Sequence, residues 1–349
     1  MPSIKPGSTV LVTGASGYIA SHTTDILLSK GYNVRGTVRS DSKGKYLANL
    51  FKGKQGKFDF VIVEDISKQG AFDNAVKNVD GVAHMASPYY FHAETPEELS
   101  VPAIHGTVGI LESLKRTNPN VQRVVVTSSS ASIIDGTIKA PHTFTEESWN
   151  EISAKRCEEL GAKASGQDKY RASKVLAERA FWKFFEENKP SFDGVSINPT
   201  LVLGPIIHQC DKPESLNTSV AGYYAWLTGR KSQDDLPAQN GNYVDVRDTA
   251  LAHVLALTTP GSGGQRFITS NGPFSANDYV LQIEKDFPDL YKANNVPRGN
   301  NDKDYKSNLI NQAIKFDGSN SIRELGLQYR PIEETLNEMG KSLRERFNF

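Results

Sequence analysis

Residues 9–20 of the chain, TVLVTGASGYIA, join a short apolar strand to the start of a helix. The small residues follow the spacing G-x-x-G-x-x-A. The first glycine permits a tight turn, the second lets the backbone approach a pyrophosphate, and Ala20 allows close helix–strand packing. The amino end of the helix also favours negative charge. A tight turn without a ligand is the alternative. In this position we favour a dinucleotide site, contacted by Gly14, Ser16, Gly17, Tyr18 and Ile19.

The first two-thirds of the chain alternate short apolar strands with helical patterns. We expect strands at 9–13, 33–38, 58–63, 81–85, 123–127 and 194–198. Helices are expected after Gly17 and after Pro96, the second with Thr95 as N-cap and Glu98 completing a capping box. Strands that alternate with helices pair in parallel through right-handed crossovers. The pattern therefore predicts an α/β fold with a Rossmann-type doubly wound parallel sheet.

After Pro199 the pattern loosens. Helices are expected at 219–228, 248–258, 275–287 and 332–346, a strand at 265–269, and a polar surface loop at 294–307. We predict a smaller, mostly helical substrate-binding lobe at the carboxyl edge of the sheet, where ligands of such sheets bind. The expected division assigns 1–200 to the dinucleotide-binding Rossmann domain, to which 243–270 returns, and 201–242 with 271–349 to the lobe.

The end of the second expected strand indicates which dinucleotide binds. An NAD site usually places Asp or Glu there to hold the ribose 2′-hydroxyl, but this chain has Arg39. Its guanidinium can fork onto a 2′-phosphate, with Lys45 as a second cation. Alternatively, Arg39 is a solvated surface residue and Asp41 takes the ribose. We favour NADP(H).

Two further strand ends are expected near the dinucleotide. Asp65 and Ile66 follow the third strand, where a carboxylate can accept from the adenine amino group; a turn aspartate is an equally good interpretation. Ala86 follows the fourth strand and is expected to pass beneath the dinucleotide. His84, beside it, is interpreted as a core histidine rather than a ligand.

The residues that suggest chemistry lie further along. Tyr170 and Lys174 are four apart and therefore share one helix face. The ammonium favours the phenolate form, so the tyrosine can exchange protons nearer neutral pH. The fifth strand ends in Thr127-Ser128-Ser129-Ser130, where a hydroxyl can hydrogen-bond a substrate carbonyl. Strand-end hydroxyls are also common as caps, but together the patterns suggest a nucleotide-dependent oxidoreductase.

These motifs resemble those of extended short-chain dehydrogenases/reductases, in the branch of dihydroflavonol and cinnamoyl-CoA reductases, and among them fungal carbonyl reductases. The resemblance runs over nearly the whole chain, including Asn198-Pro199, Leu203-Gly204-Pro205 and Tyr243-Val244-Asp245-Val246-Arg247-Asp248. It implies that Tyr170 is the general acid and that Lys174 lowers its pKa and holds the nicotinamide ribose. It implies that Ser129 positions and polarises the substrate carbonyl, or Ser130 if the motif is shifted by one residue. It also places Thr127 and Pro199 beside the cofactor. The stretch 134–167 is longer than the resemblance leads us to expect.

Aromatic residues are candidates for the substrate pocket. Phe91 follows the fourth strand, and Tyr223 and Trp226 lie at helical spacing further on. Ligand pockets are lined mainly by such side chains, but core packing explains them equally well. The resemblance implies an NADPH-dependent carbonyl reductase acting on aldehydes and ketones. The alternatives are a nucleotide-sugar epimerase and a non-catalytic NADP(H) sensor.

The composition narrows the partners. Forty Lys and Arg balance forty Asp and Glu, which gives no electrostatic reason to expect nucleic acid or an anionic membrane. Two cysteines and no signal-peptide pattern suggest a cytoplasmic location. The sequence contains no H-E-x-x-H pattern and no Cys/His cluster, so we expect no bound metal. We expect a small carbonyl compound as partner and a monomer or homodimer.

Overall fold

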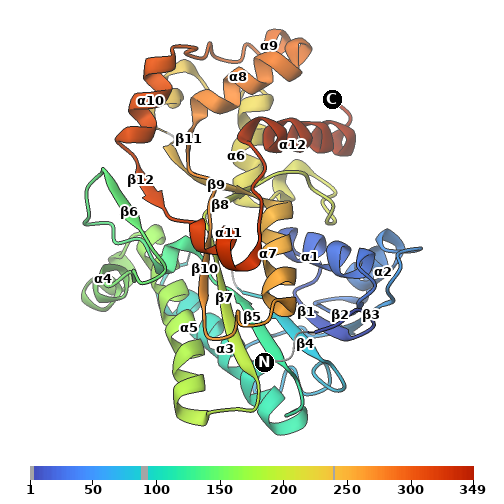
Figure 1. The fold of residues 1–349 in the computed structure, drawn as a ribbon. Coiled ribbons are helices and arrows are strands. Elements are labelled where there is room, and N and C mark those ends of the chain that lie inside the picture. Colours follow the sequence, from blue (N-terminus) through green and yellow to red (C-terminus); the bar gives the residue numbers. More distant parts are fainter. Residues whose placement is uncertain (1–3, 88–92, 239) are drawn as a thin grey trace.

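The centre of the molecule is a seven-stranded sheet in which every neighbouring pair is parallel. The computed structural model describes residues 4–87, 93–238 and 240–349. The strand order is β10-β7-β5-β4-β1-β2-β3 (Figure 1). The predicted doubly wound sheet is confirmed. Its strands are β1 (Thr9–Thr13), β2 (Asn33–Val38), β3 (Phe58–Ile62), β4 (Gly81–His84), β5 (Arg123–Thr127), β7 (Asp193–Pro199) and β10 (Arg266–Thr269).

Helices cover both faces of this sheet. In β1, Val10 and Val12 pack toward α1 (Tyr18–Ser29) and α7 (Val246–Thr258), whereas Leu11 packs toward α3 (Glu97–Thr117) and α5 (Gly166–Asn188). This alternation is what the two-residue period of a strand requires when both faces are buried. The helices around the sheet are α1 (Tyr18–Ser29), α2 (Asp41–Leu50), α3 (Glu97–Thr117), α5 (Gly166–Asn188) and α7 (Val246–Thr258).

Two expected details differ from the structure. Residues 63–80 form a series of turns rather than a regular helix, and Phe72, Val76 and Val79 nevertheless bury their side chains against the sheet. Helix α3 has Pro96, not Thr95, at its N-cap, and the Glu98 carboxylate accepts from the Thr95 amide at 3.4 Å. Half of the expected capping box is therefore present.

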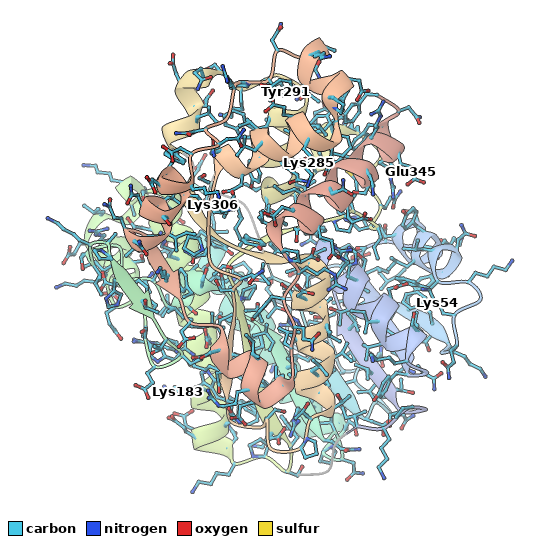
Figure 2. The ribbon with its side chains drawn as sticks, turned by 45° about the horizontal axis from the view of Figure 1, so that its top comes forward. Lys54, Lys183, Lys285, Tyr291, Lys306 and Glu345 are labelled. Atoms are coloured by element: carbon cyan, nitrogen blue, oxygen red, sulfur yellow. The ribbon has the colours of Figure 1, made fainter. Side chains whose placement is uncertain are left out.

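The second part of the molecule lies over the carboxyl edge of the sheet (Figure 1). It is built on a three-stranded sheet of β11 (Pro273–Ser275), β9 (Asn240–Asp245) and β8 (Leu201–Leu203), of which the sequence analysis foresaw none. Figure 2 labels charged side chains on both parts of the molecule, among them Lys183 on α5 beside the large sheet and Lys306 on the second part. The helices are α6 (Thr218–Leu227), α8 (Ala276–Asp286), α9 (Pro288–Ala293), α10 (Lys303–Asn311), α11 (Ser319–Leu325) and α12 (Ile332–Phe347).

The expected loop at 294–307 is wrong in its second half. Helix α10 begins at Lys303 because Asp302 caps it, accepting from the Asp304 amide at 2.8 Å. A polar composition signals exposure, and α10 is an exposed helix rather than a loop. Strand β10 and helix α7 lie with the large sheet, whereas β9 lies with the small one. The exact domain boundaries stay a prediction.

The stretch 134–167 bridges the two parts. Strand β6 (His142–Phe144) pairs in parallel with β12 (Ile314–Phe316), and α4 (Ile152–Leu160) packs against α5. Short 3-10 helices complete the structure: η1 (Ser130–Ser132), η2 (Gly161–Lys163), η3 (Pro213–Ser215) and η4 (Gln233–Ala238).

Candidate active site

The glycine-rich turn lies where the direction of winding reverses, between β1 and β4. Gly14 has φ +63°, and a Cβ there would lie 3.1 Å from the Ala86 Cα, so the turn requires glycine. Helix α1 then starts from Gly17 with no side-chain cap and no acidic residue in its first turn. The free amides and the helix dipole therefore suit an anionic group.

The ends of β1 and β4 are tied together at this point. The Thr13 hydroxyl oxygen accepts from the amides of Met85 and Ala86, at 2.9 and 3.0 Å. It also lies 3.0 Å from His84 Nδ1. Burial lowers the pKa of His84 to about 3, so this histidine is a neutral core residue, as the sequence analysis interpreted it. The predicted contact of Ala86 with the dinucleotide stays a prediction.

The cations after β2 are not equivalent. Arg39 is exposed and makes no hydrogen bond or ion pair within the described parts of the chain. Lys45, by contrast, lies 2.7 Å from the Asp41 carboxylate, one helical turn away. Lys45, the predicted second cation, therefore forms an ion pair with Asp41, the alternative ligand of the ribose. Lys43, which the sequence analysis did not single out, is exposed on the same turn of α2.

The strand-end carboxylate Asp65 forms a turn. Its Oδ1 accepts from the amide and the hydroxyl of Ser67, at 2.9 and 2.6 Å, and these bonds lower the pKa of Asp65. The turn interpretation is therefore present in the structure, and its contact with adenine stays a prediction. Ile66 lies against Gly106 of α3, where a Cβ would come within 2.9 Å of Ile66 Cδ1.

Helix α5 carries the tyrosine–lysine pair. Ser165 caps the helix, so Tyr170 is the fifth helical residue. The Lys174 ammonium lies 5.9 Å from the centre of the half-buried Tyr170 ring and donates to Ser87 Oγ at 3.1 Å. Burial lowers the pKa of Lys174 to about 8, and the nearby Glu178 carboxylate works in the opposite direction. A positive charge therefore stands beside a phenol in a largely dry position.

The serines after β5 lie in different environments. Ser129 caps η1, and its Oγ accepts from the Ala131 amide at 3.1 Å, which leaves the hydroxyl proton available to a ligand. Ser128 is buried and donates to the Glu178 carboxylate at 2.5 Å. Ser129 and Ser130 are both half-buried. The geometry thus favours Ser129 or Ser130 over Ser128 as the group that meets a substrate.

Two other predicted cofactor contacts lie at the carboxyl edge. The Thr127 hydroxyl is 2.7 Å from Nε2 of His253, whose Nδ1 lies 2.8 Å from the Thr249 carbonyl oxygen. Because a carbonyl can only accept, Nδ1 carries the proton and Thr127 donates to Nε2. Pro199 is buried at the end of β7. Contact of Thr127, Pro199, Ser16, Tyr18 and Ile19 with a cofactor stays a prediction.

The aromatic candidates Tyr223 and Trp226 lie in the core of the second part of the molecule. Tyr223 and Trp226 are both 0% exposed, within the core formed by α6, α8 and α12. The Tyr223 ring packs edge-on against Tyr279, 5.2 Å between centres. Core packing therefore accounts for both residues, and their contact with a substrate stays a prediction. Phe91 lies outside the described residues.

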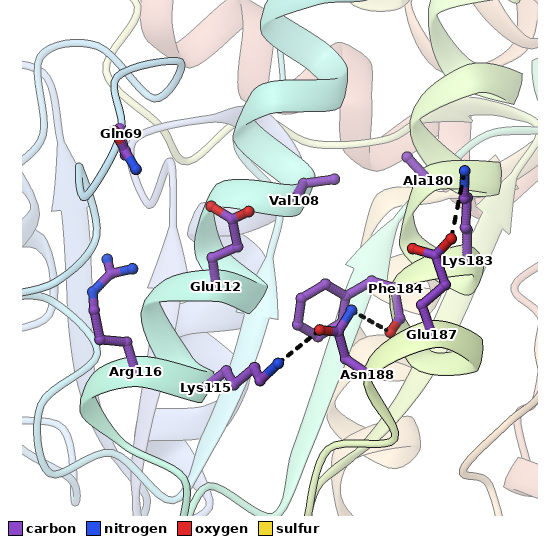
Figure 3. Close-up of a pocket in the computed structure, with 10 residues that line it drawn as sticks. All are labelled: Gln69, Val108, Glu112, Lys115, Arg116, Ala180, Lys183, Phe184, Glu187 and Asn188. Atoms are coloured by element: carbon purple, nitrogen blue, oxygen red, sulfur yellow. Dashed lines mark hydrogen bonds and ion pairs between the residues drawn. The ribbon is translucent and has the colours of Figure 1, made fainter.

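A groove of about 670 Å³ lies elsewhere, between α3 and α5 on the outer face of the sheet. In this groove Lys115 donates a hydrogen bond to Asn188, and Lys183 forms an ion pair with Glu187. Phe184 lies between the two helices (Figure 3). It contains none of the predicted site residues. Across the described ranges, no cluster of three His, Cys, Asp or Glu is arranged to hold a metal ion. Nor does any described helix have the length and apolar character to cross a membrane.

The sheet order, the glycine turn and the Tyr170–Lys174 pair together define an extended short-chain dehydrogenase/reductase. The chain belongs to the NAD dependent epimerase/dehydratase family, whose sequence profile matches residues 10–268. The resemblance inferred from the motifs is thereby confirmed.

Named relatives cover nearly the whole chain. It is 38% identical to the ketoreductase azaE of Aspergillus niger, over 96% of this chain and 97% of that protein. It is 36% identical to the NADPH-dependent methylglyoxal reductase GRE2 of Saccharomyces cerevisiae, over the same shares of the two chains. The structure of Gre2 from Candida albicans in complex with NADPH superposes with a TM-score of 0.87 at 34% identity, covering 97% of this chain and 99% of that one.

Proposed function

We propose that the protein is an NADPH-dependent carbonyl reductase that converts aldehydes and ketones, including keto esters, diketones and methylglyoxal-like compounds, to alcohols. The observation that carries this proposal is the buried Lys174 ammonium 5.9 Å from the Tyr170 ring centre, at the same sheet edge as Ser129. Relatives named as a ketoreductase and as an NADPH-dependent methylglyoxal reductase support it.

The residues present fit NADP(H). The uncapped start of α1 and the Gly14 turn suit the pyrophosphate, and the exposed Arg39, which makes no hydrogen bond or ion pair with a described residue, suits a 2′-phosphate. Asp65, Ile66 and Ala86 would border the adenosine side, and Thr127, Lys174 and Pro199 the nicotinamide side. Lys45 would assist Arg39 only by giving up its pairing with Asp41. Bound NADPH supplies the hydride that the reaction consumes.

The chain's own residues handle the carbonyl. Ser129 donates its free hydroxyl proton to the carbonyl oxygen and so stabilises the negative charge that develops on it. Tyr170 then protonates that oxygen. The Lys174 ammonium stabilises the phenolate that Tyr170 becomes, because the charge is buried and poorly screened. Ser130, half-buried beside Ser129, is the alternative donor.

An epimerase is the second candidate, since the family includes such enzymes. Its test is the same as the test of the reductase. Loss of reduced-nicotinamide absorbance is measured with methylglyoxal and with an activated β-keto ester, using NADPH and NADH in parallel. Turnover with NADPH and little with NADH supports the proposal. Preference for NADH keeps the reductase but removes Arg39 as phosphate ligand, and binding of NADPH without consumption favours the epimerase or the sensor.

A further inference from the structure

A buried carboxylate lies on α5 one turn beyond Lys174 and two turns beyond Tyr170. The Glu178 side chain is 0% exposed. Its Oε1 accepts from the Arg266 guanidinium at 2.7 Å and from the Ser196 hydroxyl at 3.0 Å. Its Oε2 accepts from three further side chains. Since a buried carboxylate is costly unless fully hydrogen-bonded, so complete a set of partners is expected.

The partners of Oε2 surround Ser129. They are the hydroxyls of Ser128 and Ser132, both at 2.5 Å, and the side-chain amide of Asn198 at 2.8 Å. Ser128 precedes Ser129 in the chain. Ser132 Oγ lies 2.8 Å from the Ser129 carbonyl oxygen, to which the Asn198 amide also points at 3.4 Å. Glu178, Ser128, Ser132 and Asn198 therefore form a polar cradle that fixes the turn carrying Ser129.

Resting on the function proposed above, we propose that Glu178 is a positioning residue, which through this cradle aims the Ser129 hydroxyl at the carbonyl that Tyr170 protonates. One rigid helix then sets both sides of the reacting group, because Tyr170, Lys174 and Glu178 occupy successive turns of α5. A displacement of about 1 Å in such a group can cost on the order of a hundredfold in rate, so the cradle acts on turnover and not on cofactor affinity.

The same carboxylate also acts on Lys174. Burial lowers the pKa of Lys174, and Glu178 opposes that change. The other groups around the ammonium are Tyr170 on its own helix, His84 at the end of β4, and Ser87 in the segment that follows β4. His84 is neutral because burial and the Lys174 charge lower its pKa. Removing the Glu178 charge is therefore expected to move the loss of activity at high pH to lower pH.

Two buried serines offer a matched test of positioning. Ser132 and Ser196 are each 0% exposed and each donates to Glu178, but only Ser132 contacts the Ser129 turn directly. Ser196 reaches the cradle only at the far side of Asn198, whose Oδ1 lies 2.9 Å from the Ser196 hydroxyl. We expect Ser132→Ala to lower kcat about tenfold with the NADPH KM unchanged. Ser196→Ala should keep kcat within about twofold while lowering Tm to a similar extent. Equal losses of kcat in the two variants, or wild-type kcat in Ser132→Ala, would overturn the inference.

The pH profile provides the second readout. In Glu178→Gln the fall of kcat/KM at high pH should begin at lower pH than in the wild type. If this variant folds poorly, Glu178→Gln combined with Arg266→Gln removes both charges and should show the same displacement; an unshifted profile in a folded variant contradicts the role. A wild-type protein that reduces no carbonyl would instead overturn the proposed function, which distinguishes the two failures.

Discussion

Lys174 extends from α5 so that its ammonium lies 5.9 Å from the centre of the Tyr170 ring, one helical turn earlier. The lysine is 8% exposed, and its ammonium donates a hydrogen bond to Ser87 Oγ. A charge with so little solvation is costly to the fold and effective on a neighbouring phenol. Burial of the Lys174 charge therefore lowers the stability of the fold and strengthens the effect of that charge on Tyr170.

Replacing Tyr170 by Phe should abolish carbonyl reduction and leave NADPH binding nearly unchanged. The ring remains and only the hydroxyl that donates the proton is lost. We expect kcat to fall by at least about 10², with the NADPH dissociation constant, measured by fluorescence titration, within about threefold. Wild-type turnover in this variant would remove Tyr170 from the mechanism.

Replacing Lys174 by Met should stabilise the cofactor-free protein while abolishing turnover. The pKa of Lys174 falls from 10.5 to about 8 on folding, and each unit corresponds to about 1.4 kcal/mol. We therefore expect a gain on the order of 1–3 kcal/mol at pH 7, measured by urea unfolding.

This gain should depend on pH in a defined direction. Between pH 8 and 10.5 the unfolded lysine holds its proton and the folded one does not, so wild-type stability rises with pH across this window. The difference between wild type and Lys174→Met should then narrow toward pH 10. A difference that is constant with pH would show that packing, and not charge, is its origin.

Replacing Arg39 by Gln should impair the use of NADPH selectively. A bidentate arginine–phosphate contact contributes about 1.5–3 kcal/mol, so the KM for NADPH should rise about 10- to 150-fold while that for NADH changes little. Lys45→Gln is the matched control, because Lys45 is already paired with Asp41. If Lys45→Gln costs as much as Arg39→Gln, the ion pair must open when NADPH binds.

Acid should destabilise the protein through its buried histidines. Burial lowers the pKa of His253 and His208 to about 4 and that of His84 to about 3. Between pH 6.5 and 4 these histidines bind protons in the unfolded state but stay neutral in the folded state, so the free energy of unfolding falls as pH falls. Each contributes up to about 2 kcal/mol of loss at pH 5.

The test of this prediction is the slope of unfolding free energy against pH. From urea midpoints between pH 7 and 5, His253→Gln should reduce the number of protons taken up on unfolding by about one. His105→Gln, a substitution at an exposed residue, should leave that number unchanged. An unaltered slope in His253→Gln would contradict the assignment.

Local sequence patterns predicted the parts of the fold and site that depend on local geometry. The Gly14 turn needs only a strand, a glycine and a helix, and Tyr170 and Lys174 meet because of helical spacing. For Tyr223 and Trp226 the sequence left core packing and substrate contact open, because spacing shows which residues share a face but not what covers it. The covering helices α8 and α12 lie far along the chain.

Long-range pairings could not be predicted in the same way. No local pattern around Glu178 predicts that Arg266 is its partner. However, Glu178 lies four residues after Lys174 on an inward helix face, and this position could have identified Glu178 as a candidate site residue. The strands β6 and β12 have three residues each, and their pairing depends on a partner that no local pattern specifies.

The ion pair between Glu178 and Arg266 has a consequence for the order in which the nascent chain acquires its shape. The two residues are 88 positions apart, so at ~5–20 residues per second the ribosome needs roughly 4–18 s to deliver the arginine after the glutamate. During that interval β7 also lacks its outer neighbour β10. The early strands can assemble first, but the serine turn settles only when residue 266 has left the exit tunnel, so the catalytic edge is finished late in synthesis.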